Sequence, residues 1–191
     1  MKNQEIEIQV NIENIIPLLE FLEKNGVFKY EQRQIDEYFT PSHKNFVGSF
    51  PAKEWLRLRN GDGKYSINYK NWYYDKNGNS LSYCEERETK VENIEQIKDI
   101  LNFLDFKSLV VVDKLRKVWD YKDYEIAVDK VRNLGDFVEI EYKGEDEVDQ
   151  AEVVAEMKNF LKDLNCGKII LNTVGYPFQL LFPEKVKYTE L

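Results

Sequence analysis

Two residues of the same charge stand two positions apart at five places in strand-like runs of this chain. The pairs are Glu5/Glu7, Arg57/Arg59, Glu86/Glu88, Lys114/Arg116 and Glu139/Glu141. Side chains two apart on a strand point to the same face, so each pair places two equal charges on one surface. The aliphatic neighbours, such as Ile6, Leu58 and Ile140, point the other way. The pattern therefore predicts a sheet with one charged face and one apolar face.

Strand-like segments outnumber helical ones along the chain. We expect strands over residues 4–11, 27–39, 54–60, 64–74, 80–91, 108–119, 122–131 and 136–143. Apolar residues at helical spacing predict helices over Ile15–Lys24, Ile94–Leu104 and roughly 149–164, the first of them opened by Asn14 as a cap. Turn formers at Gly61-Asp62-Gly63 and Asn77-Gly78-Asn79 favour hairpins, and residues 40–52 read as a mobile loop.

The short turns between successive strands imply antiparallel pairing, and closing such a sheet removes its edges. We therefore expect an α+β fold: an antiparallel, eight-stranded, closed or nearly closed β-barrel with a charged interior and helices packed outside. The chain of 191 residues would form a single domain over residues 1–191, its C-terminal segment 149–191 being helical and packed on the barrel. A polar barrel interior is expected where the barrel holds water or a ligand.

The overall charge narrows the classes of partner. The chain has 27 basic and 35 acidic residues, a net charge of −8, which repels nucleic acid and anionic membranes. Cys84 and Cys166 give no disulfide framework and suit a reducing compartment. The segment MKNQEIEIQV contains no apolar stretch of signal-peptide length, and no window approaches a membrane span. We expect a cytoplasmic protein that binds neither nucleic acid nor membrane.

The charged pairs have an ordinary interpretation and a functional one. On the ordinary one, they lie on solvated strand faces with aliphatic residues inward. On the functional one, carboxylates bind hard divalent cations while Arg and Lys bind phosphoryl oxygens, so both signs together indicate a metal–phosphate site. His43 lies in a loop beside Lys44 and favours a solvated side chain. The sequence contains no glycine-rich phosphate loop.

Eight segments in order carry a resemblance to a known family. They are EIEIQ at 5–9, QIDEYF at 34–39, WLRLR at 55–59, INYK at 67–70, EERETKV at 85–91, VDKLRKVW at 112–119, AVDKVRNLGDFVEIE at 127–141 and GYPFQLLF at 175–182. The chain resembles the CYTH proteins, or triphosphate tunnel metalloenzymes, which include class IV adenylyl cyclases, thiamine triphosphatases and inorganic triphosphatases. Class IV adenylyl cyclases are the nearest branch, on the segments QIDEYF and LGDFVEIE.

The resemblance implies a role for each matched residue. The metal-side carboxylates would be Glu5, Glu7, Glu139 and Glu141, with Mg²⁺ or Mn²⁺ as the cofactor. The triphosphate would be held by Arg57, Arg59, Lys70, Lys114 and Arg116, beside the central acidic pair Glu86 and Glu88. The positions implied in catalysis are Glu5, Glu7, Gln9, Lys70 and Asp129. The substrate would be a small-molecule triphosphate (ATP, tripolyphosphate or thiamine triphosphate), and a homodimer stays open.

Two positions depart from the family pattern. The first motif of the family ends in lysine, whereas this chain has Gln9, and a frequent arginine is replaced by Cys84. An amide can donate a hydrogen bond to a phosphate oxygen but supplies no positive charge. We expect a cyclase that converts ATP to cyclic AMP and pyrophosphate. The alternatives are an inorganic or thiamine triphosphatase in the same tunnel, and a non-catalytic module that binds nucleotide or polyphosphate.

Overall fold

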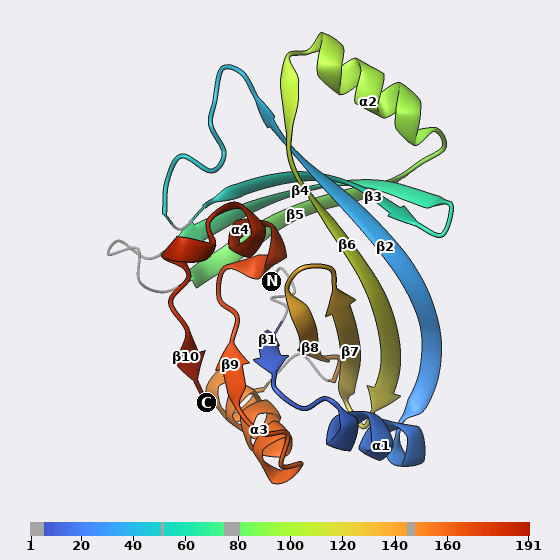
Figure 1. Ribbon diagram of the computed structural model, residues 1–191, viewed down its shortest axis with the longest axis vertical. Helices are drawn as coiled ribbons and strands as arrows, with labels where there is room; N and C mark the ends of the chain where they lie inside the picture. Colours follow the sequence, from blue (N-terminus) through green and yellow to red (C-terminus); the bar gives the residue numbers. More distant parts are fainter. Residues whose placement is uncertain (1–5, 51, 75–80, 145–147) are drawn as a thin grey trace. The chain divides into compact units, whose positions relative to one another are not determined.

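The computed structural model describes residues 6–50, 52–74, 81–144 and 148–191, which form ten strands and four α-helices (Figure 1). The strands are β1 (Glu7–Ile12), β2 (Val27–Pro41), β3 (Glu54–Gly61), β4 (Lys64–Tyr74), β5 (Leu81–Val91), β6 (Phe106–Tyr121), β7 (Tyr124–Val131), β8 (Gly135–Tyr142), β9 (Ile169–Leu171) and β10 (Thr189–Glu190). The helices are α1 (Ile16–Asn25), α2 (Ile94–Phe103), α3 (Gln150–Asp163) and α4 (Gly175–Leu181), followed by the 3-10 helix η1 (Pro183–Lys185).

The strands belong to one sheet in the order β10-β9-β1-β8-β7-β6-β2-β3-β4-β5. The α+β class and the antiparallel sheet are confirmed, but the sheet is open, with β10 and β5 at its edges. The prediction of eight strands in a closed or nearly closed barrel is therefore not confirmed. Among the described strands, the outer edge of β1 pairs with β9, which in turn pairs with β10. These two added strands occupy the edge that a barrel closing on β1 would have used.

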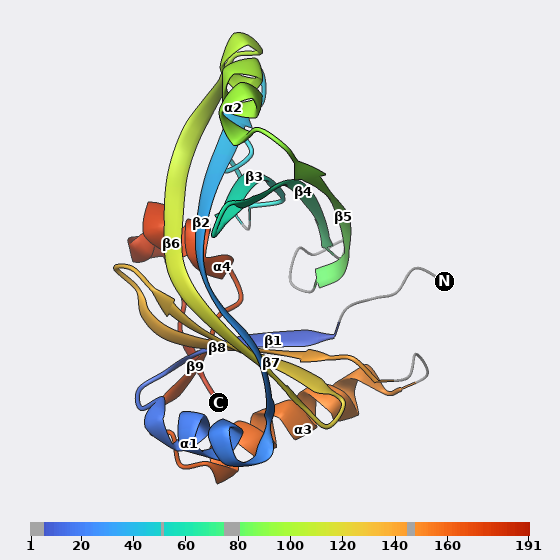
Figure 2. The same ribbon diagram turned by 90° about the vertical axis from the view of Figure 1, so that its right-hand side faces the viewer.

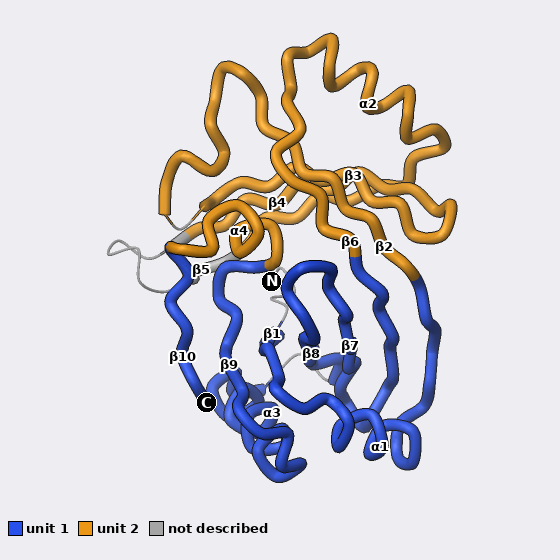
Figure 3. The backbone as a smooth tube through the Cα atoms, viewed as in Figure 1, with its two compact units in different colours: residues 1–32, 114–175, 185–191 blue, residues 33–113, 176–184 orange. Residues whose placement is uncertain are grey.

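The chain divides into two compact units (Figure 3). Unit 1 comprises residues 1–32, 114–175 and 185–191, and unit 2 comprises residues 33–113 and 176–184. Strands β2 and β6 contribute residues to both units. The single domain over residues 1–191 stays a prediction.

Unit 1 has an apolar sheet face covered by two helices. Along β1, the buried residues Ile8, Val10 and Ile12 alternate with polar residues. They pack in one core with side chains of α1 and α3, including Leu22 and Met157. Figure 2 shows both helices on the same side of β7 and β8. The other face of these strands is left for polar side chains, as strand alternation predicts.

Unit 2 repeats this plan with a single covering helix. Leu56 and Leu58 of β3 and Phe39 of β2 pack with Ile94 and Leu101 of α2. Helix α2 begins after Asn93, whose side chain accepts a hydrogen bond from the backbone N–H of Gln96, the usual capping arrangement. The residues that alternate with these are Trp55, Arg57 and Arg59 on β3 and Tyr38 on β2. Each unit thus has an apolar sheet face and one that carries charged residues, which in unit 2 also holds two aromatic rings in contact.

Local signals explain most element boundaries. The β3–β4 hairpin turns through Asp62 and Gly63, both with positive φ (48° and 83°), which is the two-residue turn that matches strand twist. Asp149 accepts hydrogen bonds from the first backbone N–H groups of α3. The cap predicted at Asn14 is displaced by one residue: Ile15 is the N-cap, and Asn14 Oδ1 accepts from the N–H of Ile16 at 3.2 Å.

The C-terminal segment 149–191 is more varied than the predicted helical packing. Helix α3 has the expected bounds within one residue, but β9 and β10 extend the sheet of unit 1. A three-residue strand such as Ile169–Leu171 is too short to show the alternation that reveals strands in sequence. No helix in the described part of the chain has the length and apolar character needed to cross a membrane.

Candidate active site

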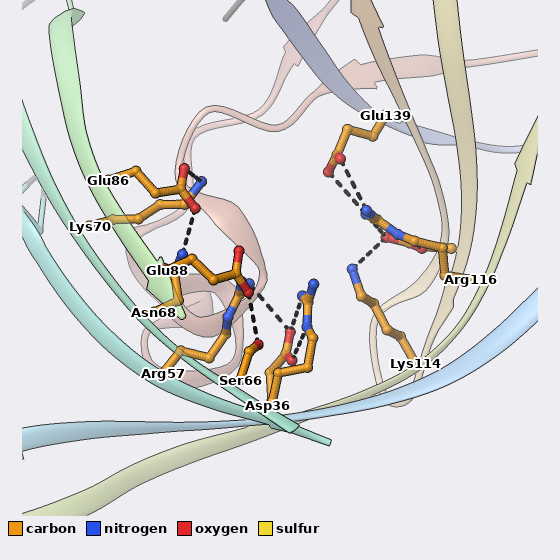
Figure 4. Close-up of polar contacts among 12 residues, drawn as sticks. Asp36, Arg57, Ser66, Asn68, Lys70, Glu86, Glu88, Lys114, Arg116 and Glu139 are labelled. Atoms are coloured by element: carbon orange, nitrogen blue, oxygen red, sulfur yellow. Dashed lines mark hydrogen bonds and ion pairs between the residues drawn. The ribbon is translucent and has the colours of Figure 1, made fainter. Parts of the chain in front are cut away.

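The charged face of unit 1 carries a cluster that we call the unit 1 cluster: Lys114 and Arg116 on β6, Asp129 on β7 and Glu139 on β8. Arg116 lies directly opposite Asp129 in the β6–β7 ladder, and Glu139 lies opposite Ala127, two residues from Asp129. Residues that face each other in antiparallel strands share a face, so the register brings all four side chains together. Figure 4 shows Arg116 reaching toward Glu139.

Asp129 is the centre of this cluster. Lys114 Nζ donates to its Oδ2 at 2.9 Å, and Arg116 forms a bidentate pair with it, at 2.7 Å from Nε and 2.6 Å from Nη2. The side chains of Asp129 and Lys114 are only 1% and 3% exposed. Burial by itself raises the pKa of Asp129, but the charges of Lys114 and Arg116 outweigh it and hold the pKa far below its ordinary value. Asp129 is therefore an ionised residue that fixes two cations.

Glu139 is held by donors from two other strands. Arg116 Nη1 and Nη2 donate to its two oxygens at 3.2 and 3.1 Å, and Gln9 Nε2 donates to Oε2 at 2.9 Å. Burial raises the pKa of Glu139, but the charges of Arg116 and Lys114 reverse that effect and lower it to about 2. Gln9, at the position of the family's lysine, thus contacts the carboxylate predicted as a metal ligand.

The other predicted metal-side carboxylates lie beside this cluster or outside the described residues. Glu7, the first residue of β1, lies opposite Glu141 in the β1–β8 ladder, as Gln9 lies opposite Glu139. Glu141 forms an ion pair of 2.6 Å with Lys143. Glu5 is outside the described residues. Within the described chain, no group of three or more His, Cys, Asp or Glu side chains is gathered closely enough to hold a metal ion.

The charged face of unit 2 carries the unit 2 cluster: Asp36 on β2, Arg57 and Arg59 on β3, Asn68 and Lys70 on β4, and Glu86 on β5. Asp36 is its buried carboxylate, with a side chain 2% exposed. Arg59 binds it in a bidentate pair at 2.6 and 2.7 Å, whereas Arg57 Nη1 is 3.6 Å away. Among the described residues, Nε of Arg57 is buried and has no hydrogen-bond partner. Arg57 therefore contacts Asp36 less closely than Arg59 does.

The second half of the unit 2 cluster is centred on Glu86. Its oxygens accept from Asn68 Nδ2 at 2.5 Å and from Lys70 Nζ at 2.8 Å (Figure 4). Burial raises the pKa of Glu86, but its attraction to Lys70 and the bond from Asn68 outweigh this and lower the pKa. Lys70 also lies 5.8 Å from the ring centre of Trp72, a cation–π contact. The partner acid Glu88 is exposed and accepts from Ser66 Oγ at 2.8 Å.

Three polar residues of these networks escaped sequence reasoning. Asp36 and Asn68 had a usable signal, because the alternations Q-x-D-x-Y and S-x-N-x-K place polar residues on one strand face. Asn172, which binds Gln9, had none: the two positions are 163 residues apart. Cys84 is partly exposed and pairs in register with Trp72, and His43 is exposed in its loop.

Comparisons with known proteins identify the family and the fold of the chain. The CYTH domain family matches residues 3–169. A Methanocaldococcus jannaschii protein named "Putative adenylate cyclase" is 33% identical over 166 residues, which cover 86% of this chain and 91% of that protein. A Pyrococcus horikoshii OT3 protein of solved structure has a TM-score of 0.71 at 22% identity, covering 94% of this chain and 99% of that one.

A Hippeastrum protein has the same fold, with a TM-score of 0.68 at 16% identity, covering 96% of this chain and 97% of its own. It is described as a "putative adenylyl cyclase" with a dominant triphosphatase activity. The fold and the two clusters define an α+β protein whose open antiparallel sheet has paired acids and cations on its charged face. The chain belongs to the CYTH family, as the sequence motifs predicted.

Proposed function

We propose that this chain is a divalent-metal-dependent enzyme acting on a triphosphate, and that it works as a class IV adenylyl cyclase. The observation that carries the proposal is the unit 1 cluster, in which Asp129 holds Lys114 and Arg116 on a charged sheet face beside Glu139. Such preorganised cations stabilise phosphoryl charge without reorganising during the reaction. The name of the M. jannaschii relative, at 33% identity, favours the cyclase.

The cations supply the proposed binding of phosphoryl oxygens. Arg57 and Arg59 lie two positions apart on β3 and therefore share one face, and Lys70 lies on the neighbouring strand β4. Arginine matches phosphate geometry with two parallel N–H groups, and lysine acts as a point charge. In this proposal each of these three residues binds phosphoryl oxygens, as Lys114 and Arg116 of unit 1 are proposed to do. Asp36 and Asp129 orient the cations of their own units. Glu86 and Glu88 are proposed to set the orientation of Lys70 and its neighbours.

The residues of β1 and β8 fit a hard divalent cation. Magnesium is usually held by one or two carboxylates and the substrate phosphates, so a cage of three protein acids is not required. Glu139 accepts three hydrogen bonds, which leaves part of the acceptor capacity of a carboxylate open. Glu7 and Glu141 present carboxylates at neighbouring register positions. We propose Glu5, Glu7, Glu139 and Glu141 as the ligands of Mg²⁺ or Mn²⁺, which when bound would offset charge on phosphoryl oxygens.

The proposed reaction needs positioning more than covalent participation by the protein. The ribose 3′-hydroxyl of ATP forms a bond to the α-phosphorus, the bond from that phosphorus to the bridging oxygen breaks, and pyrophosphate leaves. The hydroxyl proton passes to solvent. The chain's residues bind the phosphates, keep them in line and hold the carboxylates ionised. A cytoplasmic location, where ATP is abundant and both thiols stay reduced, is part of the same proposal.

A second candidate is a triphosphatase, in which water attacks a terminal phosphorus in the same site. It is favoured by the activity described for the Hippeastrum protein. The third candidate, a module that binds nucleotide or polyphosphate without turnover, rests on Gln9 and Cys84 together. If the missing cations would act mainly in the transition state, their absence lowers turnover more than affinity.

Product analysis separates the three candidates. The protein is incubated with ATP, tripolyphosphate and thiamine triphosphate, each with Mg²⁺ or Mn²⁺, and nucleotides, pyrophosphate and phosphate are quantified. Cyclic AMP and pyrophosphate in equal amounts support the cyclase. Phosphate release from any substrate supports the triphosphatase. If calorimetry detects binding but none of the three substrates gives a product, both enzyme candidates are excluded and the binding module is supported.

A further inference from the structure

Asn172 has a side-chain amide whose orientation is set by the backbone. It follows β9, and its N–H donates to the carbonyl oxygen of Gln9 at 2.7 Å. Its Oδ1 accepts from the N–H groups of Val174 and Gly175 at 3.3 and 3.1 Å. Because backbone N–H groups can only donate, the oxygen of the amide must face them. The NH₂ group of Asn172 therefore faces the other way.

That NH₂ group determines the orientation of the next amide. Asn172 Nδ2 donates to Oε1 of Gln9, and Gln9 Nε2 donates to Oε2 of Glu139 at 2.9 Å. With its oxygen occupied by a donor, Gln9 can only turn its own NH₂ toward the carboxylate. The hydrogen bonds run in one direction from the backbone through two amides to Glu139. All of these residues belong to unit 1.

We propose that Asn172 is a positioning residue that orients the amide of Gln9 and, through it, the Glu139 carboxylate. The inference rests on the proposed function, in which Glu139 holds the metal ion. Gln9 and Asn172 then act together at the position of the family's lysine. The Nε2 group of Gln9 donates to Glu139 as one N–H of an ammonium group would, but without its charge. Outer partners that orient a metal ligand in this way typically change metal affinity or activity by about 10–100-fold when removed.

The arrangement predicts that positions 9 and 172 depend on each other. The substitution Q9K alone directs a donor-only ammonium group at the NH₂ of Asn172, so two donors meet. The substitution N172D alone directs a carboxylate at Gln9, which favours turning the NH₂ of Gln9 away from Glu139. Together, Q9K and N172D restore a donor facing an acceptor, and they add a cation beside Glu139. The two single changes are mismatches, and the double change is a match.

The first experiment observes the amide of Gln9 in the full-length protein without ligand. Side-chain amide resonances are recorded by ¹⁵N NMR, and that of Gln9 is identified by its loss in Q9E. The substitution N172S keeps an oxygen that can accept from the backbone N–H groups, as serine does in turns, but cannot reach Gln9. We expect the Gln9 amide to exchange its hydrogens slowly in the wild type and faster in N172S. The matched control is N11A. Asn11 lies on β1 with Gln9, and its amide donates to the carbonyl of Asp136 on β8.

The second experiment measures Mn²⁺ binding by calorimetry and turnover for the wild type, N172S, N172D, Q9K and Q9K/N172D. We expect the two mismatched single changes to weaken Mn²⁺ binding by about tenfold each, and the double change to recover it to the wild-type level or above. Equal Gln9 exchange in the wild type and N172S, or additive effects of Q9K and N172D, would overturn the inference. A wild type without turnover would remove the proposed enzyme, while the NMR and Mn²⁺ data still decide on Asn172.

Discussion

The unit 1 and unit 2 clusters share one arrangement of charges but differ in how closely the charges are paired and how exposed they are. In each, a buried aspartate holds two cations that lie two apart on a neighbouring strand: Asp129 with Lys114 and Arg116, and Asp36 with the β3 arginines. Lys114 is 3% exposed, Arg116 and Arg57 are each 13% exposed, and Arg59 is 20% exposed. The cations of unit 1 are fully engaged by carboxylates. In unit 2, Arg57 lies 3.6 Å from Asp36, and Arg59 is the most exposed of the four cations.

The difference suggests a division of work between the clusters. A buried charge is costly to leave unpaired, so a tight set such as Lys114, Asp129 and Arg116 fixes geometry and resists change. A guanidinium whose ion pair is 3.6 Å long, as in Arg57, loses less attraction when it exchanges that contact for a phosphoryl oxygen. We therefore expect unit 1 substitutions to act on stability and turnover, and unit 2 substitutions to act on binding.

The largest effect on stability is expected from D129N. The change keeps the shape of the side chain but leaves Lys114 and Arg116 with only part of their compensating charge, and breaking a buried ion pair costs about 3–5 kcal/mol. The free energy of unfolding, measured with urea, should fall by that amount. The matched variant D36N should cost less, because Arg59 is 20% exposed where its counterpart Lys114 is 3% exposed. A loss for D36N equal to or larger than that for D129N would contradict the comparison.

The next effect is on turnover and comes from E139Q. The charge proposed to hold the metal is removed at constant shape, and metal-dependent activity should fall by about 100-fold, as when one preorganised charge-stabilising group is lost. Since the new NH₂ group meets the donors of Arg116, the variant should also unfold more easily, but less so than D129N.

Steady-state rates across Mg²⁺ and Mn²⁺ concentrations test this expectation. The control is E156Q on α3, which removes an exposed carboxylate that accepts from the hydroxyl of Tyr124 and lies outside the cluster. E139Q with the rates and metal dependence of E156Q would place Glu139 outside the metal site.

A smaller effect is expected when a cation of unit 2 is removed. R57A takes away one phosphoryl contact and should weaken triphosphate binding by about tenfold, within the range for hydrogen bonds to charged groups. With one cation fewer, the affinity should also fall less steeply as salt is added. Calorimetry at two salt concentrations measures both.

R33A is the matched control for this experiment. Arg33 is also an arginine of unit 2, but it is 59% exposed and paired with Asp113, and we expect it to bind triphosphate like the wild type. Equal affinities for R57A and R33A would show that the β3 arginines do not contact the substrate.

The alternation of residue types in the sequence predicted which side chains share a strand face better than it predicted which strands pair in the sheet. Arg57/Arg59 and Lys114/Arg116 do share a face in register, because that depends only on the two-residue period of a strand. The closed barrel was predicted from short turns, which fix consecutive strands but not the strand that takes the free edge of β1. That edge is taken by the short β9, whose end brings Asn172 to Gln9 across 163 positions. Such contacts depend on tertiary pairing and leave no local pattern.

The smallest expected effect is a pH dependence carried by Glu86. Its pKa is lower in the folded protein than its ordinary value, mainly because attraction to Lys70 outweighs burial. Its stabilising contribution is therefore fully present above the ordinary carboxyl pKa and is lost as the pH falls through the lowered one. The Lys70–Glu86 pair is partly exposed, at 25% and 29%, so the contribution should stay below about 1 kcal/mol. Urea unfolding of the wild type and E86Q between pH 6 and pH 3 tests it: their free energies should converge as the pH falls. A constant difference would mean that the charge of Glu86 adds nothing to stability, and that its bond with Asn68 alone holds the second half of the unit 2 cluster.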